Sequence, residues 1–138
     1  MVLPREEAEP RQLVIPETGR YVYDEQLSLR LTQRALSPSS NVSYSKNPMI
    51  VDLDAASIRF PLTLRRVAEG DRFTPLGMRG TQLVSDFLTN LKRNRFEKRN
   101  QLVLLDATGT ILWVFGLRIN DHFKLTSQSS SCLRIEIL

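Results

Sequence analysis

The residues best suited to chemistry in this sequence are cationic and lie close together. The segment Lys92–Arg99 carries five basic side chains in eight residues, with Glu97 as its one acidic residue. Arginine makes up most of the nineteen basic residues of the chain, and its planar guanidinium matches phosphate oxygens better than the point charge of lysine does. The pattern predicts binding of a polyanion, for which nucleic acid is the usual partner. The alternative is a solvated basic surface without a partner.

Groups that would carry out covalent chemistry are scarce. His122 is the one histidine, and its neighbours favour a turn or the start of a strand over a catalytic site. Cys132 is the one cysteine, which excludes an internal disulfide, and its alternating surroundings favour a buried apolar role. No phosphate-binding loop of the Gly-x-x-x-x-Gly-Lys type occurs. The sequence therefore predicts no catalytic residue and no metal site in this chain.

Charge is distributed unevenly along the chain. Residues 1–56 carry six basic and eight acidic side chains (net −2), whereas residues 57–138 carry thirteen and seven (net +6), which together give the overall +4. With 41% hydrophobic and 25% charged residues, the 138-residue chain is typical of one soluble globular domain. No apolar run approaches the ~20 residues of a membrane span, and the N-terminus lacks a secretory pattern. We therefore expect a cytoplasmic protein.

The first part of the chain, residues 1–67, is rich in short strand patterns. Strands are predicted at Gln12–Ile15, Arg20–Tyr23, Leu27–Thr32, Met49–Leu53 and Ser57–Arg66. A Pro-Glu-Thr-Gly turn separates the first two, which predicts neighbouring strands around a loop. Pro61 lies within the fifth and predicts an edge strand or a bulge. The turn-forming residues Ser37–Asn41 predict a loop.

The second part, residues 68–138, combines a glycine loop, a helix and further strands. Within the loop Ala68–Gly80, the segment Gly77-Met-Arg-Gly80 could present backbone N–H groups to a phosphate, although a tight turn is the simpler role. One main helix is predicted over about 81–91, with Thr81 as its N-cap. Strands are predicted at Leu102–Asp106, Ile111–Phe115 and Leu133–Leu138. The first two form a hairpin, and the mixture indicates the α+β class.

Short blocks of the second half carry a family resemblance. The blocks are Gly70-Asp-Arg-Phe73, Pro75-Leu-Gly-Met78, Ser85-Asp-Phe-Leu88, Ile111-Leu-Trp-Val114, Gly116-Leu-Arg-Ile119 and Asp121-x-Phe-Lys124. Together, and at this spacing, they resemble the C-terminal domain of bacterial tRNA(Ile)-lysidine synthase, the MesJ cell-cycle protein family. The resemblance covers roughly residues 63–126, whereas residues 1–62 resemble the family loosely.

The resemblance implies an α+β domain with β-sandwich-like mixed sheets, related to a domain of the phenylalanyl-tRNA synthetase β chain. The full enzymes use ATP, with Mg, to activate the wobble cytidine of tRNA(Ile) with a CAU anticodon. They join lysine to it and release AMP and pyrophosphate. Their catalytic domain contains a Ser-Gly-Gly-x-Asp-Ser loop, which this sequence lacks. Residues 1–138 are therefore expected to be a single non-catalytic C-terminal domain of a ligase, without a cofactor of its own, and Met1 need not be the natural start.

The resemblance further implies a domain that holds tRNA towards its acceptor stem through phosphate contacts. The contact residues implied by motif matches are Arg72, Lys92, Arg95, Arg99, Arg118 and Lys124. Arg79 and Arg93 are added on charge alone, and Phe96, set among basic residues, is a candidate for stacking on a base. Many relatives have basic residues at the positions of Thr81 and Gln82, so the contact near the helix is expected to be weaker or differently placed.

Each of these assignments has a structural alternative. Asp71 and Arg72 could form a local ion pair that shapes the glycine loop, and Arg118 could bond a loop carbonyl. Trp113 and Phe115 are expected to pack in the core rather than stack on a base. For the whole domain, the alternative is a scaffold that packs on the rest of its own enzyme or on a homodimer partner, with little RNA contact. An exposed apolar patch would favour that alternative.

Overall fold

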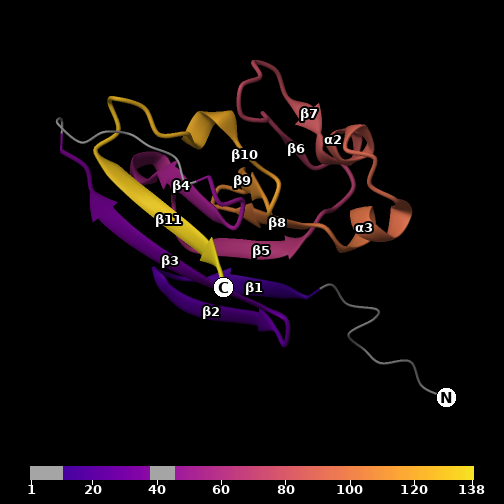
Figure 1. The fold of residues 1–138 in the computed structure, drawn as a ribbon, viewed down its shortest axis with the longest axis horizontal. Coiled ribbons are helices and arrows are strands. Elements are labelled where there is room, and N and C mark those ends of the chain that lie inside the picture. The colour runs from indigo at the N-terminus through magenta and orange to yellow at the C-terminus, as the bar shows by residue number, and fades with distance from the viewer. Residues whose placement is uncertain (1–10, 38–45) are drawn as a thin grey trace.

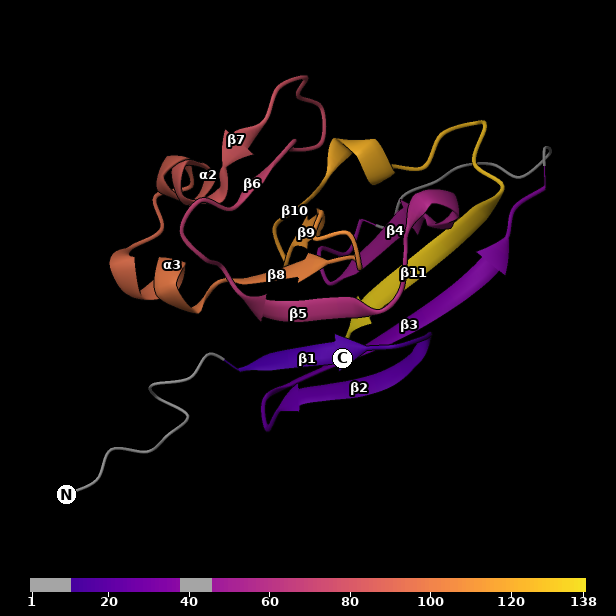
Figure 2. The ribbon, with the colours of Figure 1, turned by 180° about the vertical axis from the view of Figure 1, so that it is seen from behind.

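The structure is a computed structural model that describes residues 11–37 and 46–138. Two antiparallel sheets pack face to face, and α2 and α3 gather at one end of the molecule beside a small two-stranded ribbon (Figures 1 and 2). The five-stranded sheet has the order β1 (Gln12–Ile15), β5 (Leu62–Arg66), β8 (Leu102–Leu105), β9 (Ile111–Val114), β10 (Arg118–Ile119). The four-stranded sheet has the order β2 (Gly19–Asp24), β3 (Leu27–Ala35), β11 (Ser131–Ile137), β4 (Ile50–Asp54).

The remaining elements cover the sheets or connect them. They are η1 (Ala55–Ser57), β6 (Arg72–Phe73), β7 (Gln82–Leu83), α2 (Val84–Asn90), α3 (Arg95–Asn100) and η2 (Asp121–Phe123). The predicted α+β class, with sandwich-like sheets and one main helix, is confirmed. None of the described helices is long and apolar enough to cross a membrane.

The main core lies between the two sheets. Alternate residues of β3, such as Leu29 and Leu31, point inward from one sheet, and Leu64 and Leu104 point inward from the other. This alternation is the period that the sequence showed, because successive side chains of a strand leave on opposite faces. Trp113 of β9 joins this core and is 1% exposed.

A second core lies on the outer face of the five-stranded sheet. There Val103 and Val114 pack against Val84, Phe87 and Leu88 of α2. Because β8 and β9 are covered on both faces, their sequences are continuously apolar rather than alternating. The two strands pair antiparallel, so the predicted hairpin is confirmed.

Two strand predictions are wrong in detail. Gln12–Ile15 and the following strand do not pair with each other, because β1 pairs with β5 while β2 pairs with β3 in the other sheet. The turn between them therefore carries the chain across the core. Pro61 marks neither an edge nor a bulge, since β5 begins at Leu62 and lies between β1 and β8. Because Pro61 precedes the first paired residue of β5, every residue of the strand keeps a backbone N–H donor.

The helix prediction also needs correction. The helix begins at Val84 rather than near Thr81, because Gln82 and Leu83 pair with β6 first. Thr81 does not cap the helix; its Oγ1 accepts a hydrogen bond from Arg72 Nε at 3.3 Å. The second helix, α3, was not predicted. Most of the predicted loop Ser37–Asn41 lies outside the described residues.

Candidate nucleic-acid interface

The turn between α2 and α3 places the first cations of the basic segment. The N–H of Lys92 donates to the Thr89 carbonyl (2.8 Å), and the N–H of Arg93 donates to the Leu88 carbonyl (3.0 Å). These two bonds form a Schellman motif that closes the C-terminus of α2. Lys92 adopts φ = 61°, the left-handed conformation that glycine usually provides at this point. An exposed lysine therefore stands at a position where its backbone conformation is unfavourable.

A capping box then starts α3. The N–H of Glu97 donates to Asn94 Oδ1 (2.8 Å), and the N–H of Asn94 donates to Glu97 Oε1 (2.9 Å). Arg95 and Arg99 follow four residues apart, so both are exposed on one side of the helix. Like charges at this spacing repel each other, and a bound anion would relieve that repulsion. The Asn-x-x-Glu pattern was the sequence signal for this helix.

Two contacts of α3 define how it sits on the domain. Lys98 Nζ donates to Thr89 Oγ1 of α2. Gln101, immediately after the helix, donates from Nε2 to the carbonyls of Leu102 (2.9 Å) and Phe115 (2.8 Å). Phe96 lies on α3 and is 73% exposed, so its ring has no packing role in the core.

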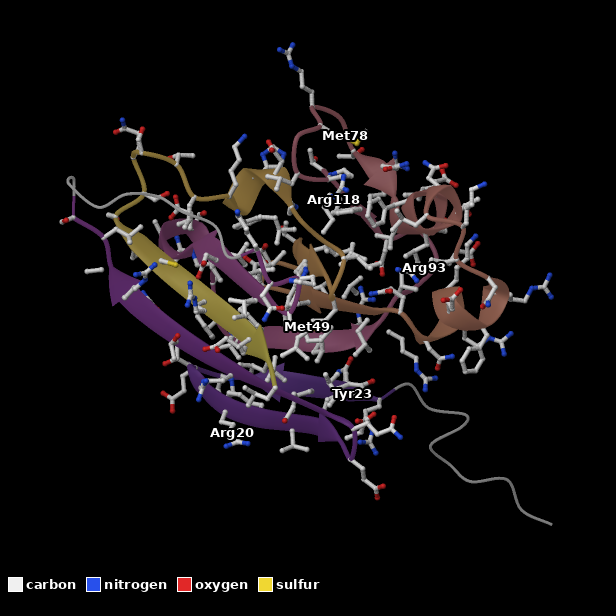
Figure 3. All side chains as sticks on the ribbon, in the orientation of Figure 1. Arg20, Tyr23, Met49, Met78, Arg93 and Arg118 are labelled. Carbon is white, nitrogen blue, oxygen red and sulfur yellow. The ribbon has the colours of Figure 1, made fainter. Side chains whose placement is uncertain are left out.

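Arg93 lies between α2 and α3 with its guanidinium only partly satisfied. Its Nη1 contacts Glu97 Oε2 at 3.4 Å. Its Nε is buried and has no hydrogen-bond acceptor among the described residues. In Figure 3, Arg93 and Arg118 lie on the side of the molecule that carries α2, whereas Arg20 lies on the opposite side, next to β2.

Arg118 of β10 is held against α2 by an aromatic ring. Its guanidinium carbon lies 5.6 Å from the centroid of the Phe87 ring, and Phe87 in turn meets Phe73 of β6 edge-on at 5.2 Å. A cation over an aromatic face keeps its charge available to solvent, and Arg118 is exposed. Arg72, also on β6, is exposed, and its Nε donates a hydrogen bond to Thr81 Oγ1.

The glycine loop is shaped by a different ion pair from the one predicted. Asp71 pairs with Arg65 of β5, through contacts of 2.9 and 3.0 Å, and not with Arg72. It also accepts the N–H of Ala68 at 2.7 Å. The β-sheet places Arg65 beside this loop, a proximity that the sequence alone did not reveal. Within residues 11–37 and 46–138, Arg72 has no acidic partner, and its side chain bonds Thr81.

Lys124 and the segment Gly77–Gly80 belong to another set of contacts. The N–H of Gly77 donates to Asp121 Oδ1 (3.0 Å), and Lys124 Nζ lies 3.1 Å from the same oxygen. The Gly77 N–H, followed by Lys124, holds the pKa of Asp121 below its usual value. Gly77 therefore serves a turn and not a phosphate site, and Arg79 projects from the same exposed loop.

The predicted residues thus fall into three groups. The predicted Lys92, Arg93, Arg95 and Arg99 form a continuous basic group with the neighbouring Lys98, which we call the α3 cluster, and Phe96 lies among them. Arg72 and Arg118 flank α2, whereas Arg79 and Lys124 lie on the loop and on η2.

Sequence reasoning also missed one neighbouring cation. Arg66, which is exposed, pairs in the sheet with Leu102, two residues after α3. Only the strand register reveals this proximity, because 36 positions separate the two residues in the sequence. The pairing therefore places the backbone of Arg66 beside the start of β8, close to the end of α3 in the chain.

Buried polar groups elsewhere are satisfied by local partners. Asp52 of β4 receives two hydrogen bonds from Arg134, at 2.8 and 3.0 Å, and the thiol of Cys132 lies 3.5 Å from the same carboxylate. Burial, followed by the charge of Asp52, raises the pKa of the Cys132 thiol. Across residues 11–37 and 46–138, no three His, Cys, Asp or Glu side chains are grouped so as to hold a metal ion. Cys132 is fully buried, as predicted.

Comparison with known proteins identifies the family. The model of the "TilS substrate C-terminal domain" matches residues 62–137. The chain belongs to this family. The tRNA(Ile)-lysidine synthase of Clostridium acetobutylicum is 32% identical over 116 residues, which are 84% of this chain and 24% of that protein. The synthase of Parabacteroides distasonis is 37% identical over 93 residues, 67% of this chain and 21% of its own length.

Solved structures support the fold of this TilS C-terminal domain. The crystal structure of a TilS C-terminal domain matches with a TM-score of 0.64 at 21% identity, covering 91% of this chain and 88% of the other. An N-terminal fragment of the phenylalanyl-tRNA synthetase β-subunit from Pyrococcus horikoshii matches with a TM-score of 0.56 at 17% identity, over 64% of this chain and 27% of the other. The chain spans about a quarter or less of the curated synthases named above.

Proposed function

We propose that this domain binds the tRNA substrate of a tRNA(Ile)-lysidine synthase and is not itself catalytic. The observation that carries the proposal is the α3 cluster. Its cations lie on a turn and on the short helix α3, and no side chain of α3 is buried. A segment that does not build the core and carries five basic residues in eight is suited to an external anion. Phosphate contacts of this kind fix the position of an RNA without reading its sequence.

In this proposal the domain serves a ligase that joins lysine to the wobble cytidine of tRNA(Ile) with a CAU anticodon. ATP with Mg, and lysine, would bind to other domains of that enzyme in the cytoplasm. Arg72 and Arg118 would continue the phosphate track from the α3 cluster across α2, since Arg118 lies over Phe87. Arg79 and Lys124 would meet the RNA only if it extends over the loop above η2. The acceptor stem is the part of the tRNA that we expect to lie there.

Salt-dependent binding to three RNAs tests this function. The chain is titrated against tRNA(Ile) with a CAU anticodon, an acceptor-stem minihelix and an unrelated RNA of equal length. Preferential binding to the tRNA and its minihelix supports recognition of the stem. Equal, weak binding to all three would contradict it and favour a scaffolding role.

The α3 cluster makes a quantitative prediction within that experiment. If Lys92, Arg93, Arg95, Lys98 and Arg99 all meet phosphates, log Kd changes with log salt with a slope magnitude of about 4. Replacing Arg95 and Arg99 by alanine should lower that magnitude by roughly two. The matched control is the double variant Arg20→Ala, Arg30→Ala, which removes the same charge from the outside of the four-stranded sheet. A slope that the α3 variant leaves unchanged would place the site elsewhere.

A second candidate function rests on an apolar surface. Leu76 is exposed and lines, with Trp113, a cavity of about 210 Å³ between β4 and β10, and Met78 is exposed two residues after Leu76. Such a surface favours packing against another domain of the same enzyme or a second copy. Sedimentation of the unmodified chain and of a Leu76→Asp, Met78→Asp double variant measures self-association and distinguishes the scaffold role from RNA binding. Self-association that the variant abolishes, without any change in RNA affinity, would favour the scaffold.

A further inference from the structure

A pocket of about 410 Å³ opens beside α3, and we propose that it binds one unpaired nucleotide of the RNA. The inference rests on the proposed RNA-binding function. The pocket is lined by the turn before α3, by α3 itself, by the first residue of β8 and by the residue after β9. The lining residues are Arg93, Phe96, Glu97, Asn100, Gln101, Leu102 and Phe115. Its volume is that of a small-ligand site and is far too small for a duplex.

Phe96 provides the stacking surface of this pocket. Its side chain is 73% exposed, and because α3 contributes no buried residue, the ring is not needed for folding. An aromatic ring on a basic surface offers its face to any base, since every base has a π-face. A base that remains in an A-form helix is already stacked on both sides. Phe96 can therefore stack only on a base that is unpaired or at the end of a helix.

Arg93 provides the polar wall of the pocket. Its buried Nε lacks an acceptor among the described residues, and its Nη1 contact with Glu97 Oε2 is long at 3.4 Å. A buried donor without a partner is rare in folded proteins. When a phosphate of the nucleotide enters the pocket, the guanidinium can exchange this weak contact with Glu97 for two parallel hydrogen bonds to two phosphate oxygens.

Gln101 keeps the two walls of the pocket in place. Its side-chain amide donates to the carbonyls of Leu102 and Phe115, so the chain leaving α3 is fixed to β8 and to the end of β9. Lys98 fixes the other side of the helix to α2 through Thr89. The pocket is thus already formed before a nucleotide enters, which lowers the cost of ordering on binding.

The test compares two RNAs that differ only in an unpaired end. One is a short blunt duplex, and the other is the same duplex with a few unpaired adenosines at one 3′ end. We expect the protein to bind the second at least about fivefold more tightly, the gain expected from stacking one base on an aromatic ring. Phe96→Ala should abolish this preference, because it weakens binding of the RNA with the unpaired end about fivefold. Phe96→Tyr should retain it.

Two further variants make the result specific. Arg93→Lys, which keeps the charge but loses the planar fork, should reduce the preference and leave the salt slope as it is. Val22→Ala shortens a side chain of the four-stranded sheet that is 65% exposed. It should change neither the preference for the unpaired end nor the salt slope. Equal binding of both RNAs by the unmodified protein, or equal weakening of both by Phe96→Ala, would overturn the pocket. Failure to bind either RNA would overturn the proposed function as well.

Discussion

Lys92 combines an unfavourable backbone conformation with a charge that faces solvent. A non-glycine residue in the left-handed region costs roughly 1–2 kcal/mol, and such strain is common at functional positions. We expect Lys92→Gly to stabilise the fold by about 0.5–1 kcal/mol in urea unfolding, since glycine removes the strain but loses more entropy on folding. The same variant should lower the magnitude of the RNA salt slope by about one. Lys92→Asn should also stabilise, and a loss of stability in both variants would contradict the assignment.

Asp121 links the glycine loop to η2 through a carboxylate whose pKa is lowered. A group with a folded-state pKa below its unfolded value stabilises the fold above the unfolded pKa and loses that contribution as the pH falls. The amide proton of Gly77 should therefore titrate with a midpoint below 3.8, the reference value for this carboxyl. NMR of the Gly77 amide measures it.

Lys124→Gln is the control for this titration. It should raise the midpoint only partly, because the Gly77 N–H is the larger cause of the lowered pKa. A midpoint that returns fully to the reference value would mean that Lys124 and not the backbone sets it.

The helix α3 depends on its capping box more than on packing. Asn94→Ala removes the acceptor for the Glu97 N–H, and N-cap replacements of this kind cost about 0.5–2 kcal/mol of helix stability. Because α3 buries no side chain, we expect faster hydrogen exchange of the Lys98 amide with little change in global unfolding. Asn90→Ala, at the end of α2, should leave that exchange rate unchanged. A large global destabilisation by Asn94→Ala would show that α3 supports the core.

The difference between local patterns and contacts across the core explains which elements could be predicted from the sequence. The β8–β9 hairpin and the periodicity of β3 follow from local patterns, and the structure contains both. The sheet to which a strand belongs is set by contacts across the core, so the separation of β1 from β2 had no local signal. α3 did have one, the Asn94-x-x-Glu97 pattern, but it buries no side chain and so lacks the apolar periodicity that marks most helices.

The candidate site likewise contains residues that the sequence could select and proximities that only the fold reveals. Residue type and spacing were enough to select the α3 cluster as a group, because its members are close in sequence. The pairing of Asp71 with the basic Arg65, the placement of Arg118 over Phe87 and the proximity of Arg66 to Leu102 all arise from contacts between elements that are distant in sequence. The unpaired Nε of Arg93 depends on side-chain packing, for which a single sequence carries no pattern.

At the scale of the whole molecule, the five-stranded sheet belongs to both cores. Leu104 packs between the sheets, and Leu88 packs between α2 and the other face of the same sheet. Replacing either by alanine should cost about 2–5 kcal/mol. Since the sheet is shared, both variants should shift one transition that Trp113 fluorescence and far-UV circular dichroism report together. Val22→Ala should stay within about 0.5 kcal/mol of the unmodified protein. Separate transitions for the two signals in Leu88→Ala would mean that the α2 layer unfolds alone.

The absence of buried side chains in α3 has a consequence for how this domain can change over generations. Residues Arg95 to Asn100 are held in a helix by the capping box and are not buried, so none of them fills space in either core. Substitutions there are not filtered by the loss of folding that limits changes in β8 or α2. We therefore expect α3 to tolerate substitution on an unchanged scaffold, and under the proposed function such substitutions would alter RNA binding. A library randomised at these six positions would be a practical route to redirected binding.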